Sequence, residues 1–177
     1  NATTSHRTKY RYENITFAGQ AASYAVLGSV AACSGFFNNC YFTAQVSGNF
    51  SVTTFTECVF LDNFNIVSPH EASACNFLRC RFSDTAVWSG DAANLQFTDC
   101  LYSASTDLIN CTGNIDGVVF SQCVTGITGG KDFFTFNNAG GTCRNLRFND
   151  CFFNDPGINA AIYIQAGAPS QLQVTGC

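Results

Sequence analysis

The sequence predicts an all-β protein that folds as a parallel β-helix, a solenoid of short strands stacked coil on coil. A motif of the form aromatic-x-x-Cys-x-aromatic recurs along the chain, and its successive cysteines lie 18, 22, 20, 23, 28 and 26 residues apart. Such spacings are typical of solenoid repeats. Within each motif, apolar residues alternate with polar ones as they do in half-buried strands. The chain has no Met and few charged residues, so little in its composition favours helix.

Each copy of the motif reads as a strand, a sharp corner and a second strand. Leu95 and Phe97 share one face of the first strand, and Cys100 and Tyr102 share one face of the next. Between them lies a polar pair, Thr98-Asp99, of residue types that tolerate turns and left-handed backbone. The copies span residues 37–42, 55–60, 77–82, 97–102, 120–125 and 148–153, and the chain ends inside a seventh at 174–177.

A third strand is expected between successive motifs, at residues 50–52, 64–66, 86–88, 108–109, 134–136 and 162–164. Three strands per coil would place equivalent inward residues in columns about 4.8 Å apart, the spacing of neighbouring strands. The first predicted column is Phe37, Phe55, Phe77, Phe97, Phe120, Phe148 and Val174. The second is Cys40, Cys58, Cys80, Cys100, Cys123, Cys151 and Cys177. The third is Phe42, Phe60, Phe82, Tyr102, Thr125 and Phe153.

The motif also resembles the core of a leucine-rich repeat, which returns through a helix or a 3₁₀ segment. The return segments here contain Gly, Asn, Ser, Thr and aromatic residues with a β-type alternation. We therefore favour the β-helix, and a helix in every repeat would decide for the alternative.

The eleven cysteines do not predict a disulfide scaffold. Their number is odd, their spacing follows the coil repeat, and most occupy positions where an inward apolar residue belongs; a free cysteine behaves as a small buried hydrophobe. We expect Cys58, Cys80, Cys100, Cys123 and Cys151 to be reduced. No metal site is expected either, because the chain lacks a C-x₂-C pair and its two histidines are isolated.

Size and charge narrow the class of protein. The 177 residues suit one domain, with a lead-in segment at 1–14 and coils over 15–177, and both ends read as cut from a longer solenoid. The net charge of −4 argues against nucleic acid and anionic membranes as partners. No apolar run is long enough to insert into a membrane, and no cofactor-binding motif is present.

Candidate functional residues lie on the outer flank. Asp62 and Asp84 occupy the same position, four residues after the main cysteine, on adjacent coils. Two neighbouring carboxylates are what a retaining glycosidase uses for catalysis, and two turn-forming aspartates are the competing interpretation. Trp88, next to a Val87 expected to point inward, is expected to face outward, either as a carbohydrate contact or packed against a loop or another subunit. Asp91 in the following loop is assigned to the same surface.

The coils at 94–100 and 145–151 resemble those of the pectate-lyase-like right-handed parallel β-helix superfamily, most closely bacteriophage tailspikes. The resemblance concerns the fold pattern of about seven coils from Ile15 onward. It implies a homotrimer on a virion or other extracellular surface that binds host polysaccharide. The alternatives are a polysaccharide hydrolase or lyase that uses Asp62 and Asp84, and a purely structural spacer of a spike.

Overall fold

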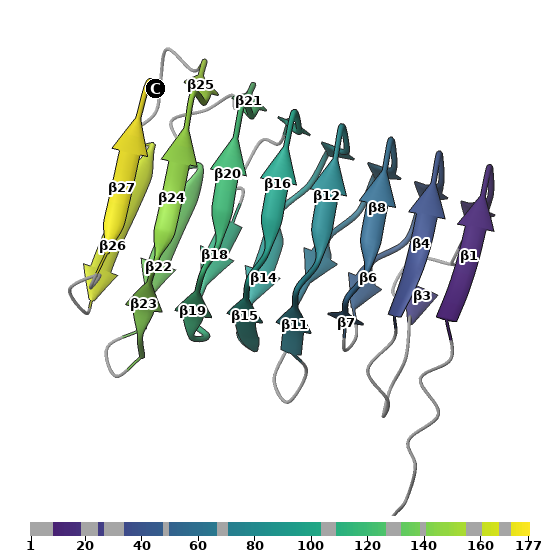
Figure 1. Ribbon diagram of the computed structural model, residues 1–177, viewed down its shortest axis with the longest axis horizontal. Coiled ribbons are helices and arrows are strands. Elements are labelled where there is room, and N and C mark those ends of the chain that lie inside the picture. The colour runs from purple at the N-terminus through teal and green to yellow at the C-terminus, as the bar shows by residue number, and fades with distance from the viewer. Residues whose placement is uncertain are drawn as a thin grey trace, which may run out of the picture.

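A computed structural model of the chain shows a solenoid built from parallel strands (Figure 1). It describes residues 9–18, 25–26, 34–47, 50–66, 71–103, 109–126, 132–138, 141–154, 161–166 and 171–177. Every strand pairing among these residues is parallel, and none of them lies in a helix. The leucine-rich alternative is therefore wrong for the described coils, and the parallel β-helix is confirmed.

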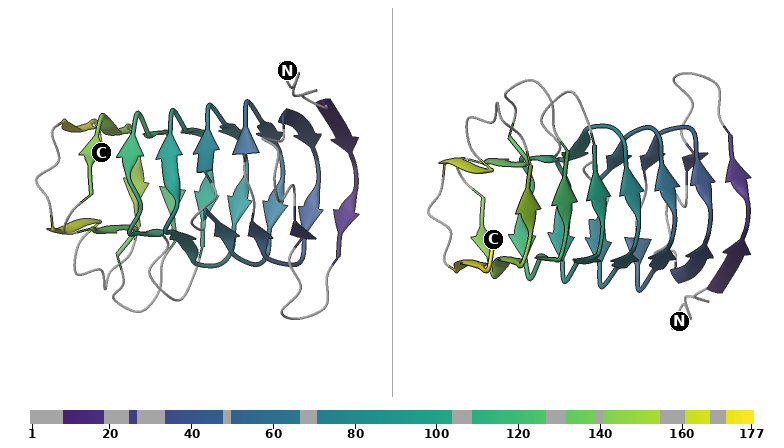
Figure 2. Two further views of the ribbon diagram at one scale, coloured as in Figure 1. Left: turned by 90° about the horizontal axis from the view of Figure 1, so that it is seen from below. Right: turned by 90° about the horizontal axis from the view of Figure 1, so that it is seen from above.

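Two long sheets carry the strand-corner-strand motif. Sheet A consists of β1 (Lys9–Glu13), β4 (Ser34–Asn38), β8 (Thr54–Thr56), β12 (Asn76–Leu78), β16 (Gln96–Thr98), β20 (Val119–Ser121), β24 (Leu146–Asn149) and β27 (Leu172–Thr175). Sheet B consists of β2 (Thr16–Phe17), β5 (Tyr41–Phe42), β9 (Val59–Phe60), β13 (Arg81–Phe82), β17 (Leu101–Tyr102), β21 (Val124–Thr125) and β25 (Phe152–Phe153). Each sheet therefore runs along the stack of coils, and Figure 2 shows the stack from two sides.

Two further faces close the five coils that start at β4, β8, β12, β16 and β20, so each of these coils has four described strands rather than the three predicted. The third face is made of sheet C, with β3 (Ala25–Val26), β6 (Val46–Ser47) and β10 (Phe64–Asn65), and sheet E, with β14 (Ala86–Trp88), β18 (Ile109–Cys111), β22 (Phe134–Asn137) and β26 (Ile162–Ala166). A bridge from Ile66 to Trp88 joins these two sheets. Sheet D is the fourth face, with β7 (Phe50–Ser51), β11 (Glu71–Ser73), β15 (Asp91–Ala93), β19 (Ile115–Asp116) and β23 (Cys143–Arg144).

The segment at 50–52 was assigned to the wrong face. Phe50 is buried in β7 and pairs with Ala72 of sheet D, so it is not equivalent to Phe64 on the third face. Val52 is exposed and has a left-handed backbone with φ 52°, so it is a corner residue rather than an inward strand residue. The apolar character of Phe-x-Val hid this turn, because a β-branched residue is rarely found at positive φ.

The register of the predicted columns is confirmed where the structure describes them, but Val174 and Cys177, which were expected to point inward, are exposed. Phe37 pairs with Phe55, Phe55 with Phe77 and so on through Phe148 with Val174. Successive rings from Phe37 to Phe148 stack with centroids 4.5–5.0 Å apart. This separation matches the strand spacing, so the coil repeat itself sets the aromatic stacking.

In the third column, one coil has a small residue in place of an aromatic ring, and a neighbouring side chain fills the space. Thr125 takes the position that Tyr102 and Phe153 hold in the adjacent coils. Phe133 is fully buried and packs edge-on against Tyr102 at 5.0 Å and against Phe120 at 5.3 Å. It also lies 5.6 Å from the ring of Phe153. The aromatic volume that Thr125 lacks is thus supplied by the residue that immediately precedes β22 of sheet E.

The stack of coils begins earlier than the predicted boundary at Ile15. β1 pairs along its whole length with β4, and Tyr12 lies opposite Phe37 with ring centroids 5.2 Å apart. Residues 9–13 therefore belong to the first coil instead of a lead-in segment. The basic residue Arg11 projects outward and lies over the ring of Phe36 at 5.4 Å.

Candidate functional site

The paired aspartates occupy corresponding positions on adjacent coils. Phe60 pairs with Phe82 before them, and Ile66 pairs with Trp88 after them. Because the connecting segments have equal length, Asp62 and Asp84 are in register at the junction between sheet B and the third face. The sequence alignment that placed them together is therefore correct.

Each aspartate is held by the chain that follows it. One Oδ1 accepts a hydrogen bond from the backbone N–H of Asn63, and the other from that of Thr85, both at 2.7 Å. This is the turn-forming role of Asp. Asp84 is exposed and Asp62 is half-buried.

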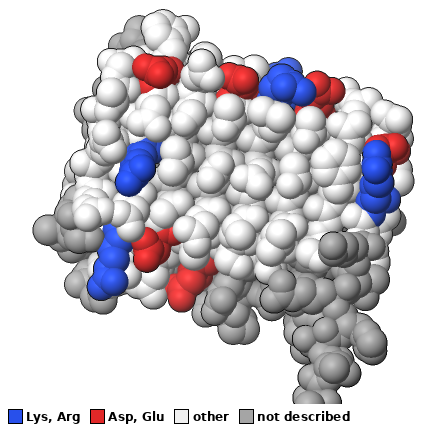
Figure 3. Space-filling model, in the orientation of Figure 1, with Lys and Arg blue, Asp and Glu red and all other residues white. Residues whose placement is uncertain are grey.

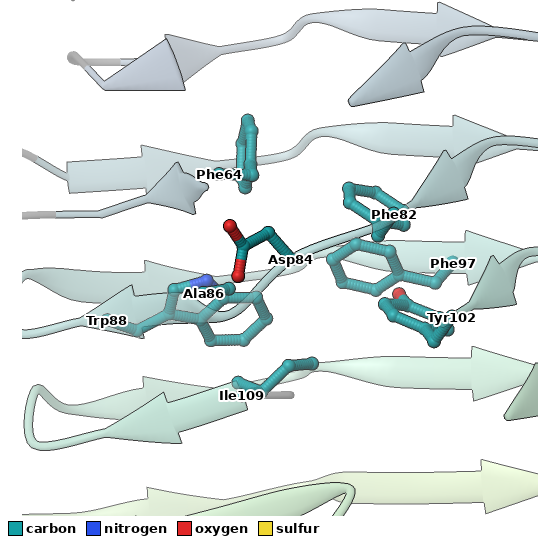
Figure 4. Close-up of a pocket in the computed structure, with 8 residues that line it drawn as sticks. All are labelled: Phe64, Phe82, Asp84, Ala86, Trp88, Phe97, Tyr102 and Ile109. Carbon is teal, nitrogen blue, oxygen red and sulfur yellow. The ribbon is translucent and has the colours of Figure 1, made fainter. Parts of the chain in front are cut away.

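A small pocket lies beside Asp84, and its lining is mostly aromatic (Figure 4). The pocket exists because Ala86 occupies an inward position held by Phe64 and Ile109 in the neighbouring coils. Asp84 is its only charged lining residue. The remaining lining residues are Phe82, Trp88, Phe97 and Tyr102. Its volume of about 10 Å³ is close to the ~10–15 Å³ that one water requires, so a whole sugar ring does not fit inside it.

Trp88 was predicted to be exposed, and this prediction is wrong. Trp88 is 1% exposed and stacks on Phe97 at 5.9 Å, whereas Val87 is 38% exposed. The strand Ala86–Trp88 is apolar throughout, so no polar residue revealed which face was inward, and a shift of one residue reverses every side chain. Trp88 therefore supports the core beside Asp84 and cannot stack on a sugar.

Two polar groups near this pocket have no hydrogen-bond partner among the described residues: the Trp88 Nε1–H and the Tyr102 hydroxyl. Tyr102 is 2% exposed, and its burial raises the pKa of the phenol well above its usual value. Both belong to the buried wall behind Asp84, so the phenol stays neutral.

Asp91 does not join the aspartate pair. It begins β15 on sheet D, across β14 from Asp84, and is exposed. Its Oδ1 accepts hydrogen bonds from the backbone and side-chain N–H groups of Asn114, at 3.1 and 2.9 Å. Asn114 in turn accepts one from the backbone N–H of Thr142 at 2.9 Å. Asp91 is thus the first member of a polar ladder that ties three coils together.

Sheet A presents a broad outer surface that is poor in charge (Figure 3). None of the strands β4, β8, β12, β16, β20 and β27 contains a charged residue. Charges gather at its margins, as in the ion pair between Arg79 and Glu57 at 2.9 Å on the corner beside it. This surface offers amides and hydroxyls to a partner rather than charge.

Sheet B carries an exposed apolar column that the sequence analysis did not identify. Neighbouring strands place outward residues in register along it, including Leu101, Val124 and Phe152, which are 39%, 40% and 62% exposed. Tyr41 and Val59 extend the column, and Arg81 interrupts it. The alternation Arg81-Phe82 and Leu101-Tyr102 contained this signal, because every second residue must point outward.

The cysteine column is unbridged, as predicted, and its members from Cys40 to Cys151 are buried, whereas Cys177 is exposed. Cys58, Cys80, Cys100, Cys123 and Cys151 are all free and buried. Burial raises the pKa of Cys80 to about 12. The pKa of Cys123 also rises to about 12, because of its hydrogen bond to Cys100 and its burial. The pKa of Cys58 is lowered, because Cys80 hydrogen bonds to it, but Cys58 is fully buried.

The described part of the chain contains neither a cluster of metal-ligating residues nor a membrane-spanning helix. No group of three or more His, Cys, Asp or Glu residues there is arranged to hold an ion. No helix in the described ranges is long and apolar enough to cross a membrane. Comparison with protein-family models gives no match to the chain, and comparison with curated proteins gives none either.

Proposed function

We propose that this chain is a carbohydrate-binding β-helical segment of a viral tailspike or receptor-binding protein that recognises host surface polysaccharide. The observation that carries the proposal is the register of Asp62 and Asp84 on adjacent coils, each oriented by a hydrogen bond to the next backbone amide. Carboxylates fixed in this way accept hydrogen bonds from sugar hydroxyls without losing side-chain entropy on binding.

Two further features support a glycan partner. Paired strands lie about 4.8 Å apart, so a rigid coil repeat sets the spacing of the two carboxylates. The charge-poor surface of sheet A is suited to neutral polymers, because amides and hydroxyls match the hydrogen-bonding groups of sugars. Trp88 takes no part in glycan binding, because it is buried. Tyr163 is exposed, and it lies three strands from Val87 along sheet E.

A glycan array followed by titration calorimetry with a binding oligosaccharide tests the proposal. Asp62→Asn and Asp84→Asn should each weaken binding about 5–10-fold, because a charge-assisted hydrogen bond of about 1.5–3 kcal/mol becomes a neutral one of about 0.5–1.5 kcal/mol. Asp91→Asn is the matched control, and its affinity should be unchanged. Absence of binding across a broad array would favour the structural-spacer alternative.

Enzyme activity is the second candidate, and the aspartate pair favours it specifically. The two carboxyl groups of a retaining glycosidase lie about 5–5.5 Å apart, close to the ~4.8 Å strand spacing. A reducing-sugar assay on a bound polysaccharide separates hydrolysis from binding, and an assay for unsaturated products detects a lyase. Full cleavage by Asp62→Asn and Asp84→Asn would dismiss catalysis by this pair.

The proposed assembly is a homotrimer on a virion or other extracellular surface. The exposed apolar column of sheet B supports it, because exposed apolar stripes mark interfaces between proteins. Sedimentation equilibrium should show a trimer for the wild type and a monomer for Val124→Asp. An unchanged mass for the variant would place the interface elsewhere.

A further inference from the structure

Three departures from the coil repeat meet at the pocket beside Asp84. Ala86 is smaller than the residues at its position in the neighbouring coils, which leaves a space in the core. Trp88, the only Trp of the chain, brings an indole N–H to this space. Tyr102 brings a hydroxyl to a position that Phe82 holds in the preceding coil. Space and two polar groups thus coincide at one place in an otherwise apolar core.

Both polar groups are buried and lack a partner. Trp88 is 1% exposed and Tyr102 is 2% exposed. Among the residues that the structure describes, none hydrogen bonds to the Trp88 Nε1–H or to the Tyr102 hydroxyl. Buried polar groups in folded proteins are normally satisfied, either by another protein group or by an ordered water. The pocket therefore has the character of a binding site for a small polar ligand.

Asp84 supplies an acceptor at the same pocket. Its Oδ1 accepts a hydrogen bond from the backbone N–H of Thr85 at 2.7 Å, which fixes the carboxylate beside the pocket. Figure 4 shows the indole nitrogen of Trp88 on the ring edge that faces this carboxylate. The two groups do not hydrogen bond to each other directly. Polar groups that face each other without a direct bond are commonly bridged by a water.

Size and hydrogen-bonding chemistry identify the ligand. The volume of about 10 Å³ is near the ~10–15 Å³ that one water needs. An indole N–H only donates and a carboxylate only accepts, so the ligand must accept on one side and donate on the other. A cation cannot accept from the indole, and the carboxylate repels an anion. We propose that the pocket binds one water molecule, which accepts a hydrogen bond from the Trp88 Nε1–H and donates one to the carboxylate of Asp84.

The bound water makes the two aspartates of the candidate site unequal. Asp62 and Asp84 each accept the same turn bond, from the backbone N–H of Asn63 and of Thr85. Of the two, Asp84 also lines the pocket. The water links its carboxylate to the buried Trp88, so two hydrogen bonds orient Asp84 where one orients Asp62. This hydration site goes beyond the proposed glycan binding and does not require it.

The single Trp allows a direct test by nuclear magnetic resonance. The ¹⁵N-labelled chain has one indole N–H signal, which belongs to Trp88. A water that stays bound beside it should give a nuclear Overhauser cross-peak between the indole proton and the water frequency. Tyr102→Phe is the first control, because a hydroxyl proton exchanges with water and can give a signal at the same frequency. The cross-peak should survive in this variant, and its loss there would overturn the proposal.

The acceptor is tested with a matched pair of variants. Asp84→Ala removes the group that receives the hydrogen bond from the water, so the cross-peak should be lost. Asp62→Ala removes the equivalent turn residue of the neighbouring coil, and the cross-peak should keep its full intensity. Equal intensities in the two variants would overturn the assignment of Asp84 as the partner of the water.

Ala86→Val distinguishes a water site from a dry packing defect. Valine fills the pocket, expels the water and leaves the Trp88 N–H unpaired, which costs free energy. The midpoint of thermal unfolding should therefore fall, and the fluorescence emission of Trp88 should move to shorter wavelength. Filling a dry cavity would instead raise the midpoint, because cavity-filling substitutions stabilise a core. A higher midpoint for Ala86→Val, or no cross-peak in the parent chain, would each overturn the proposal, and neither result depends on whether the chain binds a glycan.

Discussion

Each coil turns through two corners that flank its sheet A strand, and the two corners differ in how they are encoded. At the corner after this strand, Glu57 and Asp99 have φ of 54° and 52°. At the corner before it, Val52 and Asn94 have φ of 52° and 53°. The backbone is the same, yet polar residues recur at the later corner while the earlier one accepts Val, Ala, Asn and Gly.

The inward residues show the same contrast. From Asn39 onward the later corner is followed by a cysteine, whereas Asn14 in the first coil is followed by the exposed Ile15. The earlier corner is followed by a buried residue of varying type, such as Thr53, Leu95 or Val118. A corner therefore requires a residue with left-handed backbone, followed by a buried residue. Only the later corner meets this requirement with the same residue types in successive coils. That uniformity made the motif visible in the sequence and left sheet D undetected.

The largest expected effect lies between the two corners, at Phe97. This ring is 1% exposed and stacks between Phe77 at 4.5 Å and Phe120 at 4.8 Å. Phe97→Ala should reduce the free energy of unfolding by about 3–5 kcal/mol, as for other buried Phe residues. Urea denaturation measures this change. A loss below about 1 kcal/mol would show that the register is wrong by one residue.

Truncating the buried residue that follows each corner should reduce the free energy of unfolding by different amounts at the two corners. Leu95→Ala removes a fully buried side chain and should reduce the free energy of unfolding by about 2–5 kcal/mol. Cys100→Ala removes a single sulfur and should cost less. Both variants are compared by urea denaturation. A larger loss for Cys100→Ala would mean that the thiol hydrogen bonds to Phe77 and Thr98 stabilise the coil more than packing does.

Strain should differ between the corners too. Val52 is β-branched, 56% exposed and left-handed, so Val52→Gly relieves about 1–2 kcal/mol of backbone strain. Glycine gives back about 0.4–1 kcal/mol through the entropy of the unfolded chain, which leaves a net stabilisation. Thermal unfolding should show a higher midpoint for Val52→Gly and almost no shift for Asp99→Gly. A lower midpoint for Val52→Gly would refute strain at the earlier corner.

The smallest effect is expected from the ion pair at the later corner. Arg79 and Glu57 are about half exposed, at 51% and 53%. Exposed pairs contribute about 0–1 kcal/mol, so Arg79→Ala should change the unfolding midpoint little, and added salt should reduce the difference further. A loss as large as that of Leu95→Ala would show that charge, rather than backbone geometry, holds this corner.

The columns and the later corner were predictable because the same residue types repeat at one spacing. The pairing of Asp62 with Asp84 followed from that repeat. The orientation of Trp88 did not, because Ala86-Val87-Trp88 lacks the polar alternation that reveals which face is buried. The pocket beside Asp84 was also hidden, since it arises from a small Ala86 between the larger Phe64 and Ile109, and only the register on the third face brings these residues together.

The accessibility of the column thiols tests the central claim, a parallel β-helix with stacked cysteines inside, most directly. A short pulse of N-ethylmaleimide on the native chain is followed by unfolding, a second isotopic label and peptide mass spectrometry. Cys58, Cys80, Cys100, Cys123 and Cys151 should carry only the second label, while the exposed Cys177 carries the first. Rapid native labelling of three or more of these five, or a disulfide between any two, would contradict the interior assignment and the fold that rests on it.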